Sequence, residues 1–390
     1  MSKIDPAEFE KMSGSIPLHM YERLIKETDR FSEDEVIPIL LGLYGEVGSI
    51  MSASKKYHRE KKAYIGYKEA VEEEFGDALW YFTALCGRMH VSISDVFDAA
   101  IGENAIKFIS ANDQEHAPIS QLVTAENVES LDSSLLELGY ITAQLLNVDG
   151  VSDNGKQKLI DFSRVYMKAL QSTKLSFVRI VKGNVKKSFG RFSKPIIDNL
   201  PDFDKIFPEE EQLPRYFEIH ISERKSGQSY MRWNGVFIGS PLTDNIKNPD
   251  GYRFHDVFHF AYAAILHWSP TFRALIKHKR KSDPACDEAQ DGGRAIVVEE
   301  GLTAWIYSYS KGLDYFDGHD GVSFDVLKTI QKFIQGYEVE DCPLKLWEDA
   351  ILQGYSVFRK VKDNNGGVVI GDRDKRTLSY RNLGENNEGK

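Results

Sequence analysis

Hydrophobic positions in the first half of the chain recur with the period of an α-helix. Between residues 37 and 85 two apolar stripes follow one another, each spaced by three or four residues, which is the spacing of one helix face. The second stripe consists of Val71, Phe75, Ala78, Leu79, Phe82 and Leu85. The first consists of Leu40, Leu43, Tyr44, Val47, Ile50 and Met51. These stripes predict two amphipathic helices that pack through their apolar faces.

A second helical block, roughly residues 125–192, repeats features of the first. Leu136 to Tyr140 parallels Glu73 to Asp77, and Gly183 to Lys187 parallels Glu103 to Lys107. These parallels indicate a degenerate tandem copy. Because Tyr140 stands where the first copy has an aspartate, we expect the second copy to lack a ligand set and to complete a helical bundle against the first.

The pattern changes beyond residues 193–214, a segment rich in Pro, Asp and Glu that is typical of a linker. Tyr216 to Glu223 alternates as a strand does, and Ser229 to Ile238 predicts a second strand or a hairpin. Apolar helices follow, and the end of the chain from Asp363 predicts one strand pair. The expected fold class is mainly α, with a helical bundle in the N-terminal half and a helical C-terminal domain that contains a small β element.

Composition is that of an ordinary soluble protein, with 42% hydrophobic and 28% charged residues. The net charge of −10 argues against a broad nucleic-acid surface. The basic run from Lys277 to Lys281 is either an anion site or a solvated loop. The three cysteines are far apart and exclude a disulfide framework. No signal-peptide pattern opens the chain and no apolar run approaches a membrane span, so we expect a cytoplasmic protein without membrane contacts.

Carboxylates stand beside both apolar stripes. Glu46 flanks the first stripe, and Glu74 and Asp77 are three residues apart beside the second, so they emerge together from one helix. Three carboxylates facing one another across packed helices repel unless a cation lies between them. Oxygen-only ligands favour Mg²⁺ or Mn²⁺ over zinc. The alternative is a solvated acidic face on an amphipathic helix pair.

The motif Gly-Glu-Val-Gly-Ser, followed by Lys-Lys and by Glu-Glu-Phe-Gly-Asp-Ala-Leu-Trp-Tyr, resembles the MazG-like, all-α nucleoside triphosphate pyrophosphohydrolases. That family carries ExxE on one helix and ExxD on the next, and Glu46, Glu74 and Asp77 match it. Ser49 stands where the family has its second glutamate, so fewer or weaker metal sites are expected. The resemblance implies a Mg²⁺-dependent enzyme that converts a nucleoside triphosphate, ribo or deoxy, to the monophosphate and pyrophosphate.

The resemblance also implies roles for further residues. Glu73, next to the metal set, is a candidate catalytic base that orients the attacking water. Phosphate or ribose contacts are expected from Lys55, Lys56, Asn104 and Lys107. The first two lysines are alternatively solvated residues near a helix end. A neighbouring helix pair should complete the pocket, in this chain or in a homo-oligomer such as a dimer or tetramer.

The expected domains are a MazG-like domain with the metal site at residues 1–115, a degenerate repeat at 120–192, a linker at 193–214, an α-rich domain at 215–362 and a tail at 363–390. The serine at position 49 leaves a second function open. With one ligand fewer, the first domain is alternatively a catalytically weakened nucleotide-binding module that regulates the C-terminal domain.

The C-terminal half contains a second group of candidate ligands. His255 and His259 are one helical turn apart, which is the spacing of a zinc-binding helix. Asp256 stands where the HExxH metalloproteases have their catalytic glutamate, and Glu299 or Glu300 is a candidate third ligand. A metal here implies zinc and a separate metal-dependent hydrolase activity. The alternative is a buried polar network in which both imidazoles bond to carboxylates.

Overall fold

A computed structural model describes residues 18–101, 130–147, 152–173, 175–244 and 246–383. The chain divides into two compact units, Met1–Ser193 and Lys194–Lys390. The first is built of helices, and the second combines helices with one five-stranded sheet in its described part. The predicted fold class, mainly α with a small β element, is confirmed.

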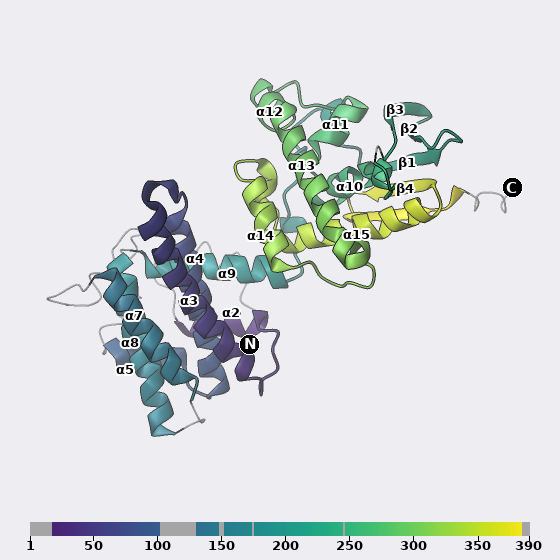
Figure 1. Ribbon diagram of the computed structural model, residues 1–390. Helices are drawn as coiled ribbons and strands as arrows, with labels where there is room; N and C mark the ends of the chain where they lie inside the picture. The colour runs from purple at the N-terminus through teal and green to yellow at the C-terminus, as the bar shows by residue number, and fades with distance from the viewer. Residues whose placement is uncertain (1–17, 102–129, 148–151, 174, 245, 384–390) are drawn as a thin grey trace. The chain divides into compact units, whose positions relative to one another are not determined.

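The first unit is a helical bundle (Figure 1). Its helices are α2 (Leu18–Thr28), α3 (Ile37–Glu60), α4 (Tyr67–Arg88), α5 (Ile93–Ile101), α7 (Leu131–Leu145), α8 (Asp153–Thr173) and α9 (Phe177–Phe192). The helix α3 packs along α4, and α7 contacts both α3 and α8. In addition, α5 packs on α8, and α9 packs on α4 and α2. The second helical block therefore shares one hydrophobic core with the first.

The two predicted apolar stripes lie in this core, with one exception. All six positions of the second stripe are buried, as are Leu43, Val47 and Ile50 of the first. Tyr44, however, is 48% exposed, so its prediction as a core position is wrong. Successive residues of a helix point about 100° apart. Because the bundle covers only a narrow face of α3, the residue that follows Leu43 already points to solvent.

The segment Ile37–Ala63 is long and apolar enough, by length and composition, to cross a membrane. This differs from the expectation that no apolar run in the chain approaches a membrane span. A core helix of a soluble protein passes the same test. Within the bundle α3 buries side chains against α4 and α7, and it carries Glu46 in its middle.

The sheet of the second unit is antiparallel throughout, in the order β3-β2-β1-β4-β5. Its strands are β1 (Tyr216–Glu223), β2 (Ser229–Trp233), β3 (Val236–Leu242), β4 (Gly366–Asp372) and β5 (Thr377–Arg381). The predicted strand, hairpin and C-terminal strand pair are thus all present. Asn234 and Gly235 both have positive φ, which suits the tight turn between β2 and β3.

The described part of the second unit also contains six α-helices. They are α10 (Asp256–Ala261), α11 (Pro270–Ile276), α12 (Pro284–Ala289), α13 (Gly293–Ser310), α14 (Phe324–Phe333) and α15 (Leu344–Asp363). A 3-10 turn, Tyr252–Phe254, precedes α10, and a π-helix, Tyr262–Leu266, follows it. In Figure 1, α15 runs beside the sheet, and it packs on α10, β4 and β5. The strand β4 lies between β1 and β5, so the segment predicted as a tail supplies an interior strand.

The segment 193–214, predicted as a linker, lies almost entirely in the second unit. Asp204 is buried and forms an ion pair with Arg273. Two residues earlier, Asp202 pairs with Arg373 at 2.9 Å. Two of the acidic residues that suggest a solvated connector are therefore partners of buried arginines.

Candidate functional site

Three carboxylates meet where α3 packs on α4. Glu46 comes from α3, and Glu74 and Asp77 come from α4, where a spacing of three places them on one face. One carboxylate oxygen of each lies within 4.8 Å of the others. All three side chains are partly buried. The structure thus brings together the residues predicted to hold the metal, while metal binding itself stays a prediction.

The electrostatics of this cluster favour a cation. Burial raises the pKa of Glu46 to about 8, and the nearby carboxylates of Asp77 and Glu74 add to the shift. A raised pKa means that the site resists accumulating negative charge, which a proton, a cationic side chain or a metal ion can offset. The donors are all carboxylate oxygens, which suit Mg²⁺ or Mn²⁺. The residues present therefore fit the metal predicted from the sequence.

The second helical block supplies partners to this cluster. Lys187 on α9 forms ion pairs with Asp77 and, at 2.6 Å, with Glu73. Asn184, one turn earlier, donates from Nδ2 to Asp77 Oδ1 at 3.2 Å. The hydroxyl of Tyr21 donates to Asn184 Oδ1 at 2.9 Å, which orients the amide. A helix expected to be structural thus contacts one of the predicted metal ligands directly.

Gly76 allows this contact. It precedes Asp77 on α4 and faces α9, and a Cβ at this position would lie 3.1 Å from Asn184 Cβ. That separation is tighter than ordinary van der Waals contact, so a larger residue would push α9 away from α4. The glycine of the Glu-Phe-Gly-Asp motif therefore serves the close approach of two helices.

Sequence patterns alone did not assign a role to Asn184 or Lys187. A signal was present, because the Asn-x-x-Lys spacing expected of Asn104 and Lys107 recurs at these two positions. The tyrosine at position 140, where the first copy has Asp77, argues against a ligand set in this block. Asn104 and Lys107 lie outside the described residues.

A cleft of about 630 Å³ opens between α4 and α9, beside the carboxylate cluster. This volume is in the range of small-molecule sites. Asp77 and Glu73 line one wall. The cationic residues of the other wall are Arg179, Lys182, Lys186 and Lys187. The helix that faces α4 across this cleft therefore comes from the same chain.

The other predicted contact residues lie elsewhere on α3 or at the rim. Glu73, the candidate base, has a side chain 39% exposed and reaches the cleft. Lys55 and Lys56 are exposed. Nine residues of helix separate Glu46 from Lys55, which is about 14 Å along the axis. Their phosphate role stays a prediction, whereas Lys187 of α9 contacts the cluster directly.

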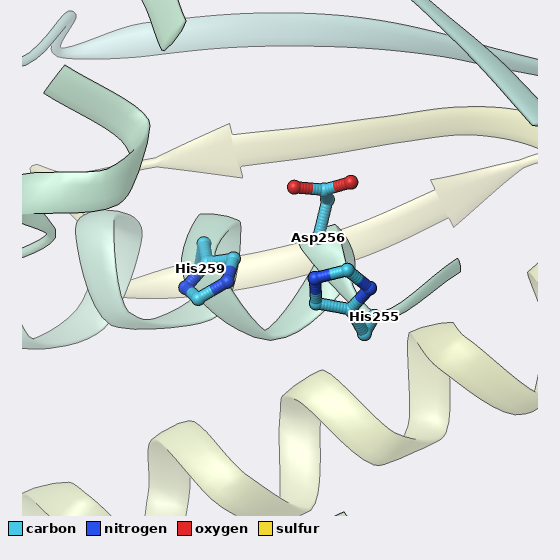
Figure 2. A group of neighbouring side chains, drawn as sticks. All are labelled: His255, Asp256 and His259. Carbon is cyan, nitrogen blue, oxygen red and sulfur yellow. The ribbon is translucent and has the colours of Figure 1, made fainter. Parts of the chain in front are cut away.

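His255, Asp256 and His259 form the second group, at the start of α10 (Figure 2). One ligand atom of each lies within 4.8 Å of the others. The Nε2 atoms of His255 and His259 lie 3.6 and 3.4 Å from carboxylate oxygens of Glu300. Glu299 is fully buried, and His259 Nδ1 lies 2.8 Å from its Oε1. Glu300 therefore lies near both Nε2 atoms, while Glu299 binds the opposite nitrogen of the His259 ring.

Burial and these contacts shift the pKa values of His259, Glu300 and Asp256. Burial by itself lowers the pKa of His259, but the carboxylates of Glu299 and Glu300 outweigh it and raise that pKa to about 10. Burial raises the pKa of Glu300, yet the two imidazoles bring it well below its usual range. The pKa of Asp256 is raised, chiefly by burial. A positive charge is thus favoured here, whether a proton or a metal ion carries it.

Residues 198–384 match the family model of the MazG C-terminal domain. The match lies within the second unit, and it relates the chain to MazG-type proteins. No curated protein and no solved structure matches the chain.

Proposed function

Because the chain is a MazG-like protein, with a MazG C-terminal domain at residues 198–384, we propose that its first unit is a Mg²⁺-dependent nucleoside triphosphate pyrophosphohydrolase. The substrate is a ribo- or deoxynucleoside triphosphate, cleaved between the α and β phosphates to a monophosphate and pyrophosphate. One observation carries the proposal. The carboxylates of Glu46, Glu74 and Asp77 converge beside a cleft whose opposite wall is cationic.

The cationic wall of the cleft suits the negative triphosphate, and the carboxylates suit the positive Mg²⁺. A triphosphate brings several negative charges, which the cations of α9 attract and orient. Lys186 is exposed at the cleft, and Arg179 pairs with Glu72 at 2.6 Å. A phosphate that displaces Glu72 would take over a guanidinium with two parallel donors. The carboxylate cluster beside the cleft would hold the Mg²⁺ that the phosphates need.

Glu46, Glu74 and Asp77 would hold the ion. When bound, it polarises the phosphoryl oxygens and lowers the pKa of the attacking water. Glu73, one residue before Glu74 and at the cleft, would accept a hydrogen bond from that water. Lys187, which pairs with both Glu73 and Asp77, holds these two carboxylates in position.

A screen of ribo- and deoxynucleoside triphosphates for pyrophosphate release, with Mg²⁺ or Mn²⁺, tests the proposal. Release from at least one nucleotide, abolished by chelator, is the expected result. If neither the wild-type chain nor the Ser49→Glu variant released pyrophosphate from any of them, the enzyme assignment would be wrong.

Ser49→Glu should raise turnover at saturating Mg²⁺ by about tenfold or more. The change adds a carboxylate three residues after Glu46, on the same side of α3, and so restores the ligand that the MazG-like pattern has. Steady-state pyrophosphate release gives the rate. Ser52→Glu is the matched control, because it adds the same charge to α3 about 240° around the axis from Glu46. Equal rates for the wild type and both variants would show that position 49 contributes no ligand.

The same pair of variants tests the second candidate function, a nucleotide-binding regulatory module. Ser49 and the ion pair of Lys187 with Asp77 favour it, because both reduce the need for a metal at the cluster. Activity that appears only in Ser49→Glu, with nucleotide binding already present in the wild type, would support the module over the enzyme.

Lys187→Met should make the first unit depend on Mg²⁺ for stability. Without this lysine Asp77 and Glu73 lose its positive charge, so repulsion within the cluster rises until a metal ion replaces the charge. In chelator we expect the melting temperature of the first unit to fall by about 2 to 6 °C, and Mg²⁺ to restore most of it. Scanning calorimetry with and without Mg²⁺ measures both.

The control for this variant is Lys156→Met, which removes an exposed lysine of α8. It should behave as the wild type in both conditions. A fall in Lys187→Met that Mg²⁺ leaves unchanged would mean that the lysine supports packing and does not substitute for a cation.

A further inference from the structure

The histidines of the second unit have their Nδ1 atoms committed to acceptors. His255 Nδ1 lies 3.0 Å from the carbonyl oxygen of Tyr252, which only accepts hydrogen bonds. His259 Nδ1 lies 2.8 Å from Glu299 Oε1. That carboxylate also accepts the hydroxyl of Ser269, at 2.6 Å, and the backbone N–H of Thr271, at 2.8 Å. Both rings therefore carry a proton on Nδ1, and in the neutral form both Nε2 atoms present a lone pair.

The two Nε2 atoms face a carboxylate without forming good hydrogen bonds to it. They lie 3.6 and 3.4 Å from Glu300 oxygens, and His259 Nε2 is fully buried without a hydrogen-bond partner among the described residues. A buried ring nitrogen with no partner costs free energy unless something binds it. In a tetrahedral metal site with bonds of 2.0 to 2.1 Å, neighbouring ligand atoms are about 3.4 Å apart. The spacing between the Nε2 atoms and Glu300 matches that edge.

We infer that His255 Nε2, His259 Nε2 and the Glu300 carboxylate bind a divalent transition-metal ion. Two imidazole nitrogens and carboxylate oxygens favour Zn²⁺ and its first-row neighbours, and not the hard cations that suit the first unit. The surroundings are those of ligating histidines, since one ring is bonded to a buried carboxylate and the other to a backbone carbonyl. The ring of Tyr252 stacks on His255 at 4.5 Å and limits its rotation.

The site has an entrance and an irregular backbone beside it. The side chain of Glu300 is 38% exposed and that of His255 is 13% exposed, so an ion reaches the donors from this side. On the other side, α10 passes directly into a π-helix, an irregularity that is frequent at functional sites. Figure 2 shows the three labelled side chains leaving one short stretch of helix.

Zinc binding to the full-length protein tests the inference. The chain is stripped with chelator, dialysed and titrated with Zn²⁺ against a chromophoric competitor, and bound zinc is counted by elemental analysis. We expect the wild type to bind one Zn²⁺ per chain more than His259→Gln, His255→Gln or Glu300→Gln, or to bind it at least tenfold more tightly. His319→Gln is the matched control, because it removes an exposed histidine of the same unit and should leave binding unchanged. Asp77→Asn should also keep this zinc, which separates the site from the proposed enzyme.

Stability gives a second readout. Chelator should lower the melting temperature of the second unit in the wild type and have little further effect in Glu300→Gln. We choose this variant because the Glu300 side chain is partly exposed, so its substitution should leave the unit folded. Zinc content and affinity that are the same in the wild type and in all three ligand variants would overturn the inference. So would a wild-type melting temperature that chelator leaves unchanged, since the site would then hold protonated imidazoles paired with carboxylates.

Discussion

Asp77→Asn should lower pyrophosphate release by about 100-fold or more while the first unit stays folded. The change keeps the volume of the side chain but removes the charge of a predicted metal ligand, and even outer-shell changes at metal sites cost 10- to 100-fold. The asparagine oxygen can still accept the hydrogen bond from Asn184 Nδ2, and Lys187 keeps Glu73 as its partner. Packing of α9 on α4 should therefore survive.

The measurement is steady-state turnover at saturating nucleotide across a Mg²⁺ titration, with circular dichroism as the check on folding. Asp161→Asn is the matched control, because it neutralises a partly exposed aspartate of α8 that forms an ion pair with Arg164 at 2.8 Å. It should keep wild-type turnover. Turnover of Asp77→Asn equal to the wild type at saturating Mg²⁺ would remove this residue from the proposed metal site.

Sequence patterns could predict the carboxylate cluster because its determinants are local. The helical period of the two stripes orients α3 and α4, and a spacing of three puts Glu74 and Asp77 on one face. Glu46 then follows from the packing of two adjacent helices. The residues that pair with the cluster depend on contacts between distant parts of the chain. Lys187 is 110 residues from Asp77 and reaches it only because α9 docks on α4, which no local pattern specifies.

The basic run at residues 277–281 illustrates the same limit in the second unit. Its composition leaves an anion site or a solvated loop as the two interpretations. Arg280 is instead fully buried and donates to Asp291 at 2.7 Å and to Glu338 at 2.6 Å. Sequence patterns suggest that a charged residue is solvated when its partners are distant in the chain. Glu338 is 58 residues from Arg280. Composition therefore separates exposed charges from paired buried charges poorly.

Asp204→Asn should lower the free energy of unfolding of the second unit by about 3 kcal/mol or more. Asp204 lies in the segment whose composition predicts a linker, yet its side chain is 1% exposed and pairs with Arg273 and, at 3.3 Å, with Arg373. It also accepts the backbone N–H of Leu213 at 2.7 Å. Removing one partner of a buried ion pair leaves the other charge without compensation, which typically costs 3–5 kcal/mol.

Two remaining contacts place the expected loss toward the lower end of that range. Arg273 keeps Asp291 at 3.6 Å, and Arg373 keeps Asp202 at 2.9 Å. Denaturant titration followed by tryptophan fluorescence measures the loss, because four of the five tryptophans lie in the second unit. Asp198→Asn, at an exposed position of the same segment, should change the free energy by no more than about 0.5 kcal/mol. If both variants unfolded at the wild-type midpoint, the segment would be the solvated connector that its composition suggests, and the ion pairs of Asp204 would not stabilise the unit.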